Sequence, residues 1–354
     1  MCDTEERESK STVSEIINVE DAVGMVLSHD ITEIRPGEFK GRAFKKGHIV
    51  REEDIPHLQR LGKEHLYILK VGEDEMHEND AADALAKALI GEGVKMAGEP
   101  NEGKINIIAE RDGLLSIDKQ ALLELNMLGE VMCATIHNNT IVIKDRVVAG
   151  TRAIPLVVKK SIVNDAVKAA ATAPDGVLRV KEMRKPNAGI VITGSEVFYG
   201  RIKDAFKPVI TKKIKAMQGT IAGVEFAPDN AEEIEKKIKS LIQKGADLIV
   251  TTGGMSVDPD DVTRFAIRNL GVSELHYGSP VLPGSMFLVA YAGAVPILGI
   301  PACGMYADIT VFDLILPRIL TGEHIGRKEI AELGHGGLCL KCETCRYPVC
   351  PFGK

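Results

Sequence analysis

From residue 189 to about residue 322, short apolar runs alternate with segments of helical periodicity, and this alternation limits the possible folds more than any other feature of the chain. Strands that alternate with helices favour a parallel sheet covered by helices on both faces. We therefore predict an α/β fold, a three-layer α/β/α unit doubly wound around a mostly parallel sheet. The predicted elements are AGIVITG (188–194), DAFKPVITKKIKAM (204–217), GTIAGVEFAP (219–228), NAEEIEKKIKSLIQKG (230–245), ADLIVTTGG (246–254), PDDVTRFAIRNLG (259–271), a strand pair within PVLPGSMFLVAYAGAVPILGIPA (280–302), and YADITVFDLILPRIL (306–320) as the last helix.

The turns that follow such strands are the expected binding site, because doubly wound sheets bind ligands at the carboxyl ends of their strands. Gly253 and Gly254 let the backbone come close to a ligand. Unpaired N–H groups at the helix starts suit phosphate. The sequence therefore predicts an anion site built from four turns: TGSEVFYGRIKD (193–204), APDNAEE (227–233), TTGGMSVDPDDVT (251–263) and GIPACGM (299–305).

Some aspartates in these turns also have a purely structural interpretation. Asp229 precedes a predicted helix and has Glu232 three residues later, which is the pattern of a helix cap with a capping-box partner. Asp258 is expected to cap the following helix, with Pro259 at its first position. Asp261, at the third helical position, favours the helix dipole. Spacing alone leaves the cap and ligand interpretations open for Asp229 and Asp261.

Taken together, TGSEVFYGRIKDA, PDNAEEI, TTGGMSVDPDDVT and the later Pro-Gly and Ile-Pro turns resemble the molybdopterin-binding domain. That domain is shared by molybdopterin adenylyltransferases and molybdopterin molybdenumtransferases. The resemblance covers about 135 residues, with the motifs in the same order. It implies a doubly wound α/β/α unit, in agreement with the alternation, and molybdopterin or adenylylated molybdopterin as the ligand.

The resemblance also implies roles for particular residues. Asp229, in the Pro-Asp turn, and Asp261, before Val-Thr, match the family's two key carboxylates, which implies catalytic residues that hold Mg²⁺. Phosphates and carboxylates repel each other unless a cation lies between them, and Mg²⁺ takes oxygen ligands from both. The implied pterin-binding residues are Thr193, Gly194, Ser195, Glu196, Thr252, Gly253, Gly254, Ser256, Pro283, Gly284 and Pro301.

Several features bear on which branch of the family is closer. GGMS is nearer the molybdenumtransferase pattern, whereas DPDDVT is nearer the adenylyltransferase pattern. Residues 45–69 resemble the stretch that leads towards this domain in molybdenumtransferases. Two departures point away from turnover: Ala302 and Cys303 stand where a glycine and an amide are expected, and the aspartate-rich segment of that enzyme's N-terminal half is not found.

The N-terminal half has weaker patterns. Asp54 is expected to cap a short helix that ends at Gly62. Asp-Gly in INIIAERDGLLSI and Asn-Asn in CATIHNNTIVI predict turns between strands, and Cys133 and His137 are interpreted as structural. The predicted organisation is a disordered start (1–15), a small mixed α/β module (16–100), a β-rich barrel-like or sandwich-like module (101–160), a helix and linker (161–188), the molybdopterin-binding domain (189–325) and a cysteine-rich tail (326–354).

The tail CLKCETCRYPVCP has the spacing C-x2-C-x2-C-x4-C-P. Clustered cysteines in a cytosolic chain suggest metal more than disulfides. The run is similar to bacterial ferredoxin ligation, although that has three residues before the last cysteine, and structural zinc also accepts four thiolates. The predicted ligands of an iron–sulfur cluster or zinc are Cys339, Cys342, Cys345 and Cys350.

Composition narrows the partners. The net charge is −6, and no basic block with interleaved aromatic residues argues for nucleic acid. No apolar run reaches the roughly 18 residues of a membrane span, and the first fifteen residues lack the apolar core of a signal peptide, so we expect a cytoplasmic protein. The resemblance implies a homo-oligomer, a dimer or trimer, that works with other molybdenum cofactor assembly proteins or molybdoenzymes.

The expected function is Mg-dependent insertion of molybdate into adenylylated molybdopterin with release of AMP. An alternative is a non-catalytic molybdopterin carrier or sensor whose cysteine tail serves in redox chemistry or docking. A third is a nucleotide pyrophosphatase of the competence-damage type, since that family shares the fold.

Overall fold

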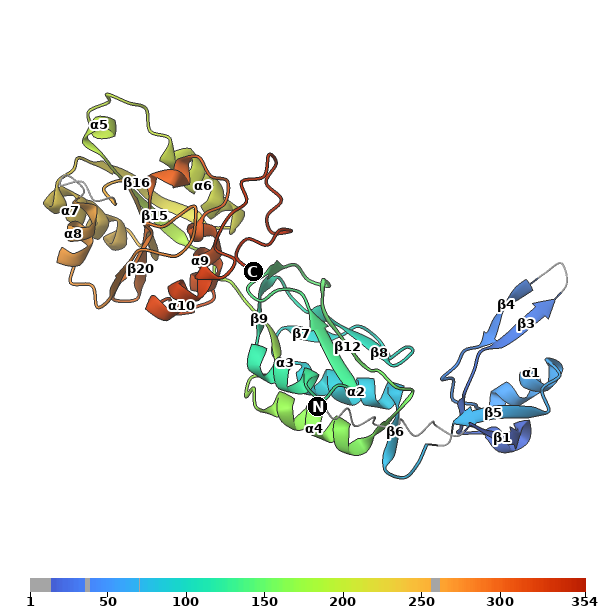
Figure 1. The fold of residues 1–354 in the computed structure, drawn as a ribbon. Helices are drawn as coiled ribbons and strands as arrows, with labels where there is room; N and C mark the ends of the chain where they lie inside the picture. The colour runs from blue at the N-terminus through green and yellow to red at the C-terminus, as the bar shows by residue number, and fades with distance from the viewer. Residues whose placement is uncertain (1–13, 36–38, 70, 256–261) are drawn as a thin grey trace, which may run out of the picture. The chain divides into compact units, whose positions relative to one another are not determined.

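The computed structural model describes residues 14–35, 39–69, 71–255 and 262–354. The chain forms two compact units (Figure 1). One comprises residues up to 110 with 117–135 and 145–179, and the other comprises 111–116, 136–144 and 180–354.

The second unit is built on a six-stranded sheet, and it confirms the predicted fold class. The strand order is β16-β15-β17-β20-β19-β18. The first four strands run parallel and the last two run antiparallel. The short edge strand β18 was not predicted. The strands are β15 (Asn187–Thr193), β16 (Thr220–Ala227), β17 (Leu248–Thr252), β18 (Leu275–Tyr277), β19 (Leu288–Ala292) and β20 (Val295–Ile300).

Helices cover both faces of this sheet, as Figure 1 shows. On one face α6 (Phe206–Ala216) and α9 (Val311–Leu320) share an apolar core with the strands. On the other face α7 (Ala231–Gln243) and α8 (Thr263–Asn269) do the same. The layers form because each helix buries one apolar stripe, which in α7 consists of Ile234, Ile238 and Leu241.

The predicted start of one helix is wrong. The N-cap of α8 is Val262, so this helix does not begin at Pro259; Asp258 and Pro259 themselves lie outside the described residues. The last helix of the alternating segment is α9, as predicted, and after it the chain forms α10 (Arg327–Ala331) and a 3₁₀ turn, η4 (Glu332–Gly334).

Residues 14–69 form a small unit of strands and short helices around a core that includes Leu27, Ile31 and Leu58. The predicted helix is present, but the Asp54 carboxylate does not cap it. Instead that carboxylate accepts hydrogen bonds from the Arg51 N–H at 2.8 Å and pairs with His48 at 2.6 Å. The elements are β1 (Ser14–Asn18), η1 (Val19–Ala22), β2 (Val26–Leu27), β3 (Ile31–Arg35), β4 (Phe39–Phe44), η2 (Glu52–Asp54), α1 (Ile55–Arg60) and β5 (His65–Leu69).

Residues 75–181 pack helices against small sheets rather than forming the expected barrel or sandwich. The four-stranded sheet β10-β12-β8-β7 is open, and α2 packs on β12 and β8. The predicted turns join strands of different sheets, since β8 and β10 both pair with β12 whereas β9 pairs with β11. Helix α3 was missed. The elements are β6 (Glu75–His77), α2 (Glu78–Leu89), β7 (Val94–Met96), β8 (Lys104–Ala109), β9 (Gly113–Ile117), α3 (Lys119–Asn126), β10 (Val131–Thr135), β11 (Ile141–Val142), β12 (Val147–Ala153), β13 (Val157–Lys159), α4 (Lys160–Ala171) and β14 (Leu178–Lys181).

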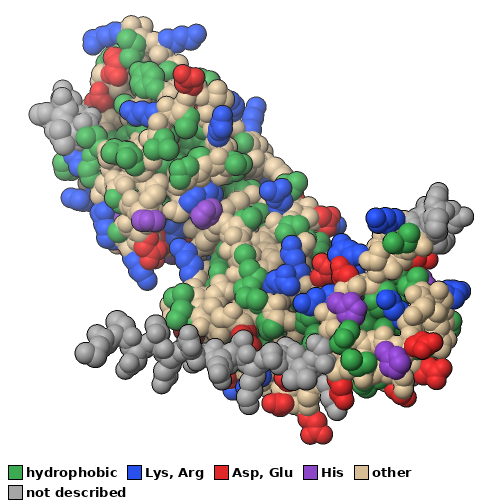
Figure 2. All heavy atoms as spheres, turned by 45° about the vertical axis from the view of Figure 1, so that its right-hand side comes forward, with side chains coloured by type: hydrophobic (Ala, Val, Ile, Leu, Met, Phe, Trp, Pro, Cys, Tyr) green, Lys and Arg blue, Asp and Glu red, His purple; other side chains and the backbone are tan. Residues whose placement is uncertain are grey.

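The surface is of mixed charge. On the face shown in Figure 2, Lys and Arg side chains stand among acidic and uncharged ones. None of the helices in the described ranges combines the length and the apolar character needed to cross a membrane.

Candidate functional site

The four predicted turns follow strands that end at one edge of the sheet. Thr193, at the end of β15, is level with Ala227, at the end of β16. Thr252, at the end of β17, is level with Ile192 on one side and Ile300 on the other. Because β15, β16, β17 and β20 are parallel, the turns after them share this edge, which is where doubly wound folds bind ligands.

Threonine hydroxyls lie in the middle of this edge. The Thr193 hydroxyl donates to the Thr252 carbonyl at 2.6 Å and lies 3.1 Å from the Thr263 hydroxyl. The side chain of Thr252 is fully buried, and its oxygen has no hydrogen-bond partner in the described part of the chain. A buried polar group without a partner costs about 1–3 kcal/mol, and the end of β17 carries that cost at Thr252.

The double glycine of the third turn is needed for the turns to pack together. Gly253 and Gly254 have φ angles of 77° and 55°. A methyl group on Gly253 would lie 2.5 Å from the Thr193 carbonyl oxygen, and one on Gly254 would lie 2.4 Å from the Thr263 hydroxyl. Packing of the protein alone therefore requires glycine at both positions, whether or not a ligand is bound.

Asp229 links the first two turns. Its carboxylate accepts a hydrogen bond from the Ser195 N–H at 2.8 Å, and its own N–H donates to the Ser195 hydroxyl at 3.2 Å. The N-cap of α7 is Asn230, whose side chain accepts from the Glu233 N–H at 3.0 Å. The interpretation of Asp229 as the cap is therefore wrong, because the residue after it does that work. Among the described residues only one of its two carboxylate oxygens is engaged.

The first turn ends in a short helix, α5 (Ser195–Phe198). Gly194, before it, has a φ of 135°. A methyl group there would lie 2.9 Å from a carboxylate oxygen of Glu196, which is exposed. Ser256 and Asp261, the other predicted ligands of this edge, lie outside the described residues, so the pairing of Asp261 with Asp229 stays a prediction.

The remaining predicted residues lie on the side of α9. The peptide bond between Leu282 and Pro283 is cis. Gly284 has a φ of 129°, and a methyl group on it would lie 2.5 Å from the Val311 side chain. Pro301 is buried and precedes the 3₁₀ turn η3 (Ala302–Met305). The structure thus places Pro301 at the common edge directly after β20.

The loop after η3 is fastened to two helices by Lys213. The Lys213 ammonium donates to the Asp308 carbonyl at 2.6 Å and pairs with Asp313 at 2.6 Å, with both side chains largely buried. Asp313 also forms the capping box of α9 with Thr310. This loop is therefore held against α6 and α9.

The segment 339–350, which we call the cysteine loop, is anchored to the same domain at both ends. Leu282 donates to the Gly337 carbonyl and accepts from the Cys339 N–H, each at 2.8 Å. After the loop, Phe352 is 3 % exposed within the core shared by α6 and α9. The loop thus starts beside Pro283 and returns into the core.

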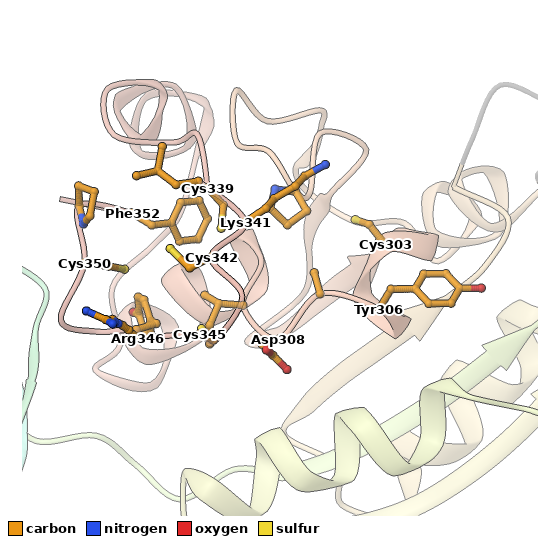
Figure 3. Close-up of a pocket in the computed structure, with 16 residues that line it drawn as sticks. Cys303, Tyr306, Asp308, Cys339, Lys341, Cys342, Cys345, Arg346, Cys350 and Phe352 are labelled. Carbon is orange, nitrogen blue, oxygen red and sulfur yellow. The ribbon is translucent and has the colours of Figure 1, made fainter.

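The cysteine loop borders a cavity of about 400 Å³ (Figure 3). All four predicted metal ligands line it, and so does Cys303 of η3. Within the described residues no three His, Cys, Asp or Glu side chains converge closely enough to hold a metal ion. The structure therefore brings the four thiols to one cavity without forming the predicted four-cysteine centre.

The sequence analysis did not predict that Cys303 lines the same cavity as the cysteine loop. Cys303 is half-buried, and burial raises the pKa of its thiol. The signal that could have found it was the replacement of the expected glycine and amide by Ala302 and Cys303. Cys133 fits its structural interpretation, since it is 3 % exposed and is not among the residues that line the cavity.

The chain was compared with known protein families. Residues 189–321 match the family described as "Probable molybdopterin binding domain". The resemblance deduced from the turn motifs is confirmed for this segment, which matches the family model of molybdopterin-binding domains. Residues 16–70 match a domain of unknown function.

Similar proteins share parts of the chain. A CinA-like protein of Mycobacterium avium is 40 % identical over 88 residues, which are 23 % of this chain and 20 % of that protein. A CinA-like protein of Mycobacterium tuberculosis is 38 % identical over 76 residues, 22 % of this chain and 18 % of that protein. The chain thus spans about a fifth of the length of the curated relatives that it matches.

Among solved structures, the molybdopterin biosynthesis enzyme MoaB of Thermus thermophilus is 24 % identical, with a TM-score of 0.34 over 39 % of this chain and 98 % of that one. The molybdopterin biosynthesis MoeA protein of Pyrococcus horikosii is 17 % identical, with a TM-score of 0.32 over 72 % of this chain and 80 % of that one.

Proposed function

We propose that the protein inserts molybdate into adenylylated molybdopterin in a Mg-dependent reaction that releases AMP. The observation that carries the proposal is the position of Asp229 in the matched domain. Its carboxylate lies at the common strand edge, joined to the first turn through Ser195, with one oxygen free of partners among the described residues. The proposed setting is a homo-oligomer in the cytoplasm that exchanges pterin with other cofactor assembly proteins or molybdoenzymes.

The residues present fit a hard cation. Carboxylate oxygens are among the ligands that Mg²⁺ prefers, and Asp229 offers one oxygen that has no partner among the described residues. Asp229 and Asp261 would hold the ion, which would supply positive charge to the phosphoanhydride. The protein itself would orient the anion through backbone N–H groups of the glycine turns. The hydrogen bonds between the turns would hold those N–H groups in place.

The direct test uses the purified full chain with adenylylated molybdopterin, Mg²⁺ and molybdate, and measures AMP. Asp229→Asn is expected to reduce AMP release at least about 100-fold, as removal of a preorganised electrostatic group does, while pterin binding persists. The control is Asp175→Asn, which removes a carboxylate exposed in the other unit. Absence of AMP release from the wild-type chain, with tight pterin binding retained, would rule out the transferase.

A carrier or sensor is the second proposal, and the fourth turn favours it. Ala302 and Cys303 replace the residues expected to contact the pterin, and Cys303 faces the cysteine cavity instead. If the protein is a carrier, the Asp229→Asn variant should bind pterin as tightly as the wild-type protein does. Neither protein should release AMP.

A pyrophosphatase of the competence-damage type remains the third proposal, favoured by the similarity to CinA-like proteins. Incubation with ADP-ribose distinguishes it, because this activity would yield AMP without pterin or molybdate.

A further inference from the structure

Five of the six cysteines in the described part of the chain border one cavity. They come from two segments that are far apart in sequence, since Cys303 belongs to η3 and the others to the cysteine loop. Figure 3 shows Cys339, Cys342 and Cys350 around Phe352, with Cys303 across the cavity from them. A single motif in the tail therefore does not account for the whole set of thiols.

Both segments are fixed to the molybdopterin-binding domain. The cysteine loop is hydrogen-bonded to Leu282 at its start, and Phe352 is buried just after its end. The loop after Cys303 is held by the ammonium of Lys213. Between these anchors Cys342 and Cys345 are exposed. The ends of both segments thus keep the thiols at the cavity while the middle of the cysteine loop has room to adjust.

Basic side chains also border the cavity. Lys341 and Arg346 line it, and neither makes an ion pair with another described residue. Asp308 is the one carboxylate among the described lining residues.

The chemistry of the lining selects the class of ligand. The thiols are accompanied by apolar walls, which include Ile309, Tyr347 and Phe352. Soft thiolate ligands select thiophilic metals such as zinc and iron–sulfur clusters over hard cations. The thiols surround a cavity of about 400 Å³ and do not converge on one point. A cluster suits such spacing better than one zinc ion does, because inorganic iron and sulfide lie between its cysteine ligands.

We propose that this cavity holds an iron–sulfur cluster ligated jointly by Cys303 and the cysteine loop. The molybdopterin-binding domain then supplies one ligand itself, from the turn directly after β20. Four ligands drawn from five thiols leave one loop cysteine spare. The proposal deepens the metal prediction for the tail and does not depend on pterin turnover.

The test is anaerobic reconstitution of the full chain with ferrous iron and sulfide, followed by iron and sulfide analysis and visible absorption. The wild-type chain is expected to take up both and to develop charge-transfer absorption. Cys303→Ser and Cys303→Ala are expected to lose at least half of the bound iron. The matched control is Cys133→Ala, which removes a thiol outside the cavity and should load like the wild type. Circular dichroism checks that each variant is folded.

A Cys→Ser series over the cysteine loop completes the experiment. Three of the four loop variants are expected to behave like Cys303→Ser, and one like the wild type. The proposal is overturned if Cys303→Ser loads the same iron with the same spectrum, since the loop alone would then supply the ligands. It is also overturned if the chain takes up no cluster but binds Co²⁺, used as a probe for zinc, with a four-thiolate spectrum. AMP release enters none of these measurements, so failure of the proposed transferase activity would leave this result intact.

Discussion

The carboxylate of Asp229 accepts a hydrogen bond from the Ser195 N–H at 2.8 Å, while the Asp229 N–H donates to the Ser195 hydroxyl at 3.2 Å. This reciprocal pair joins the turn after β15 to the turn after β16. It satisfies an N–H group at the start of α5, which has no partner within the helix. The carboxylate therefore has a structural task that leaves one of its oxygens for a ligand.

Loss of this pair is expected to open the first turn locally. Asp229→Ala leaves the Ser195 N–H without its acceptor, which should speed hydrogen exchange at that amide about tenfold. Asp229→Asn keeps an acceptor oxygen and should retain most of the protection. Amide exchange measured by NMR distinguishes the two variants, and equal exchange in both would show that the bond does not limit opening.

Replacing a glycine of the third turn with alanine is expected to destabilise the protein more than the same change at other glycines with positive φ. Gly253→Ala adds a methyl group 2.5 Å from the Thr193 carbonyl oxygen to an already unfavourable φ of 77°. We expect a loss of about 3 kcal/mol from strain and clash together. Gly271→Ala is the matched control, because its φ is 74° but no atom lies within 4 Å of the added carbon; it should cost about 1 kcal/mol. Calorimetric melting temperatures check the order, and similar values for both variants would contradict the packing argument.

Glu225 is expected to make the second unit sensitive to acid. Its carboxylate accepts hydrogen bonds from Lys244 at 3.0 Å and Lys237 at 3.1 Å, and these bonds hold its pKa below the usual value of 4.5. A carboxyl group with a lowered pKa stabilises the folded state above its unfolded pKa, and that contribution is lost as the pH falls through the folded pKa. Glu225→Gln should therefore lower the melting temperature at pH 7 more than at about pH 3. Equal shifts at both pH values would refute the ionic contribution.

Cys133 is expected to resist alkylation in the folded chain. Burial raises the pKa of its thiol to about 12, so almost no thiolate exists at pH values well below that, and the residue is only 3 % exposed. Iodoacetamide near pH 8 should label the exposed Cys342 within minutes and leave Cys133 unlabelled until urea is added. Mass spectrometry of peptides reads both sites, and early labelling of Cys133 would mean that this region opens readily.

The alternation of apolar runs and helical segments was enough to predict the sheet, the covering helices and the edge where the turns meet. It predicted these because a parallel strand buried on both faces is apolar along its length, as β17 is. The same reasoning failed between residues 104 and 158, where β9 and β11 pair with each other rather than with the strands next to them in sequence. Local turn signals cannot reveal such non-local pairing.

At the candidate site, residue types could be predicted more reliably than their partners. Asp229 and Asn230 both suit a helix cap, and only the structure shows that Asn230 takes the cap and Asp229 turns to Ser195. Likewise, the cysteine spacing predicted that the four tail thiols lie close together. That Cys303 lines the same cavity depends on how the chain folds back after α10. Neither arrangement can be predicted from local sequence, because each depends on which distant segments the fold brings together.

The backbone of Leu282 serves two neighbours at once. Its N–H donates to Gly337, just before the cysteine loop, and its C=O accepts from Cys339, the first residue of that loop. The next residue after Leu282 is Pro283 of the candidate pterin site. A shift of either neighbour must therefore strain bonds that the other also uses. A fluorophore attached at the exposed position 349 could thus serve as a reporter of pterin occupancy, read in real time and without any turnover.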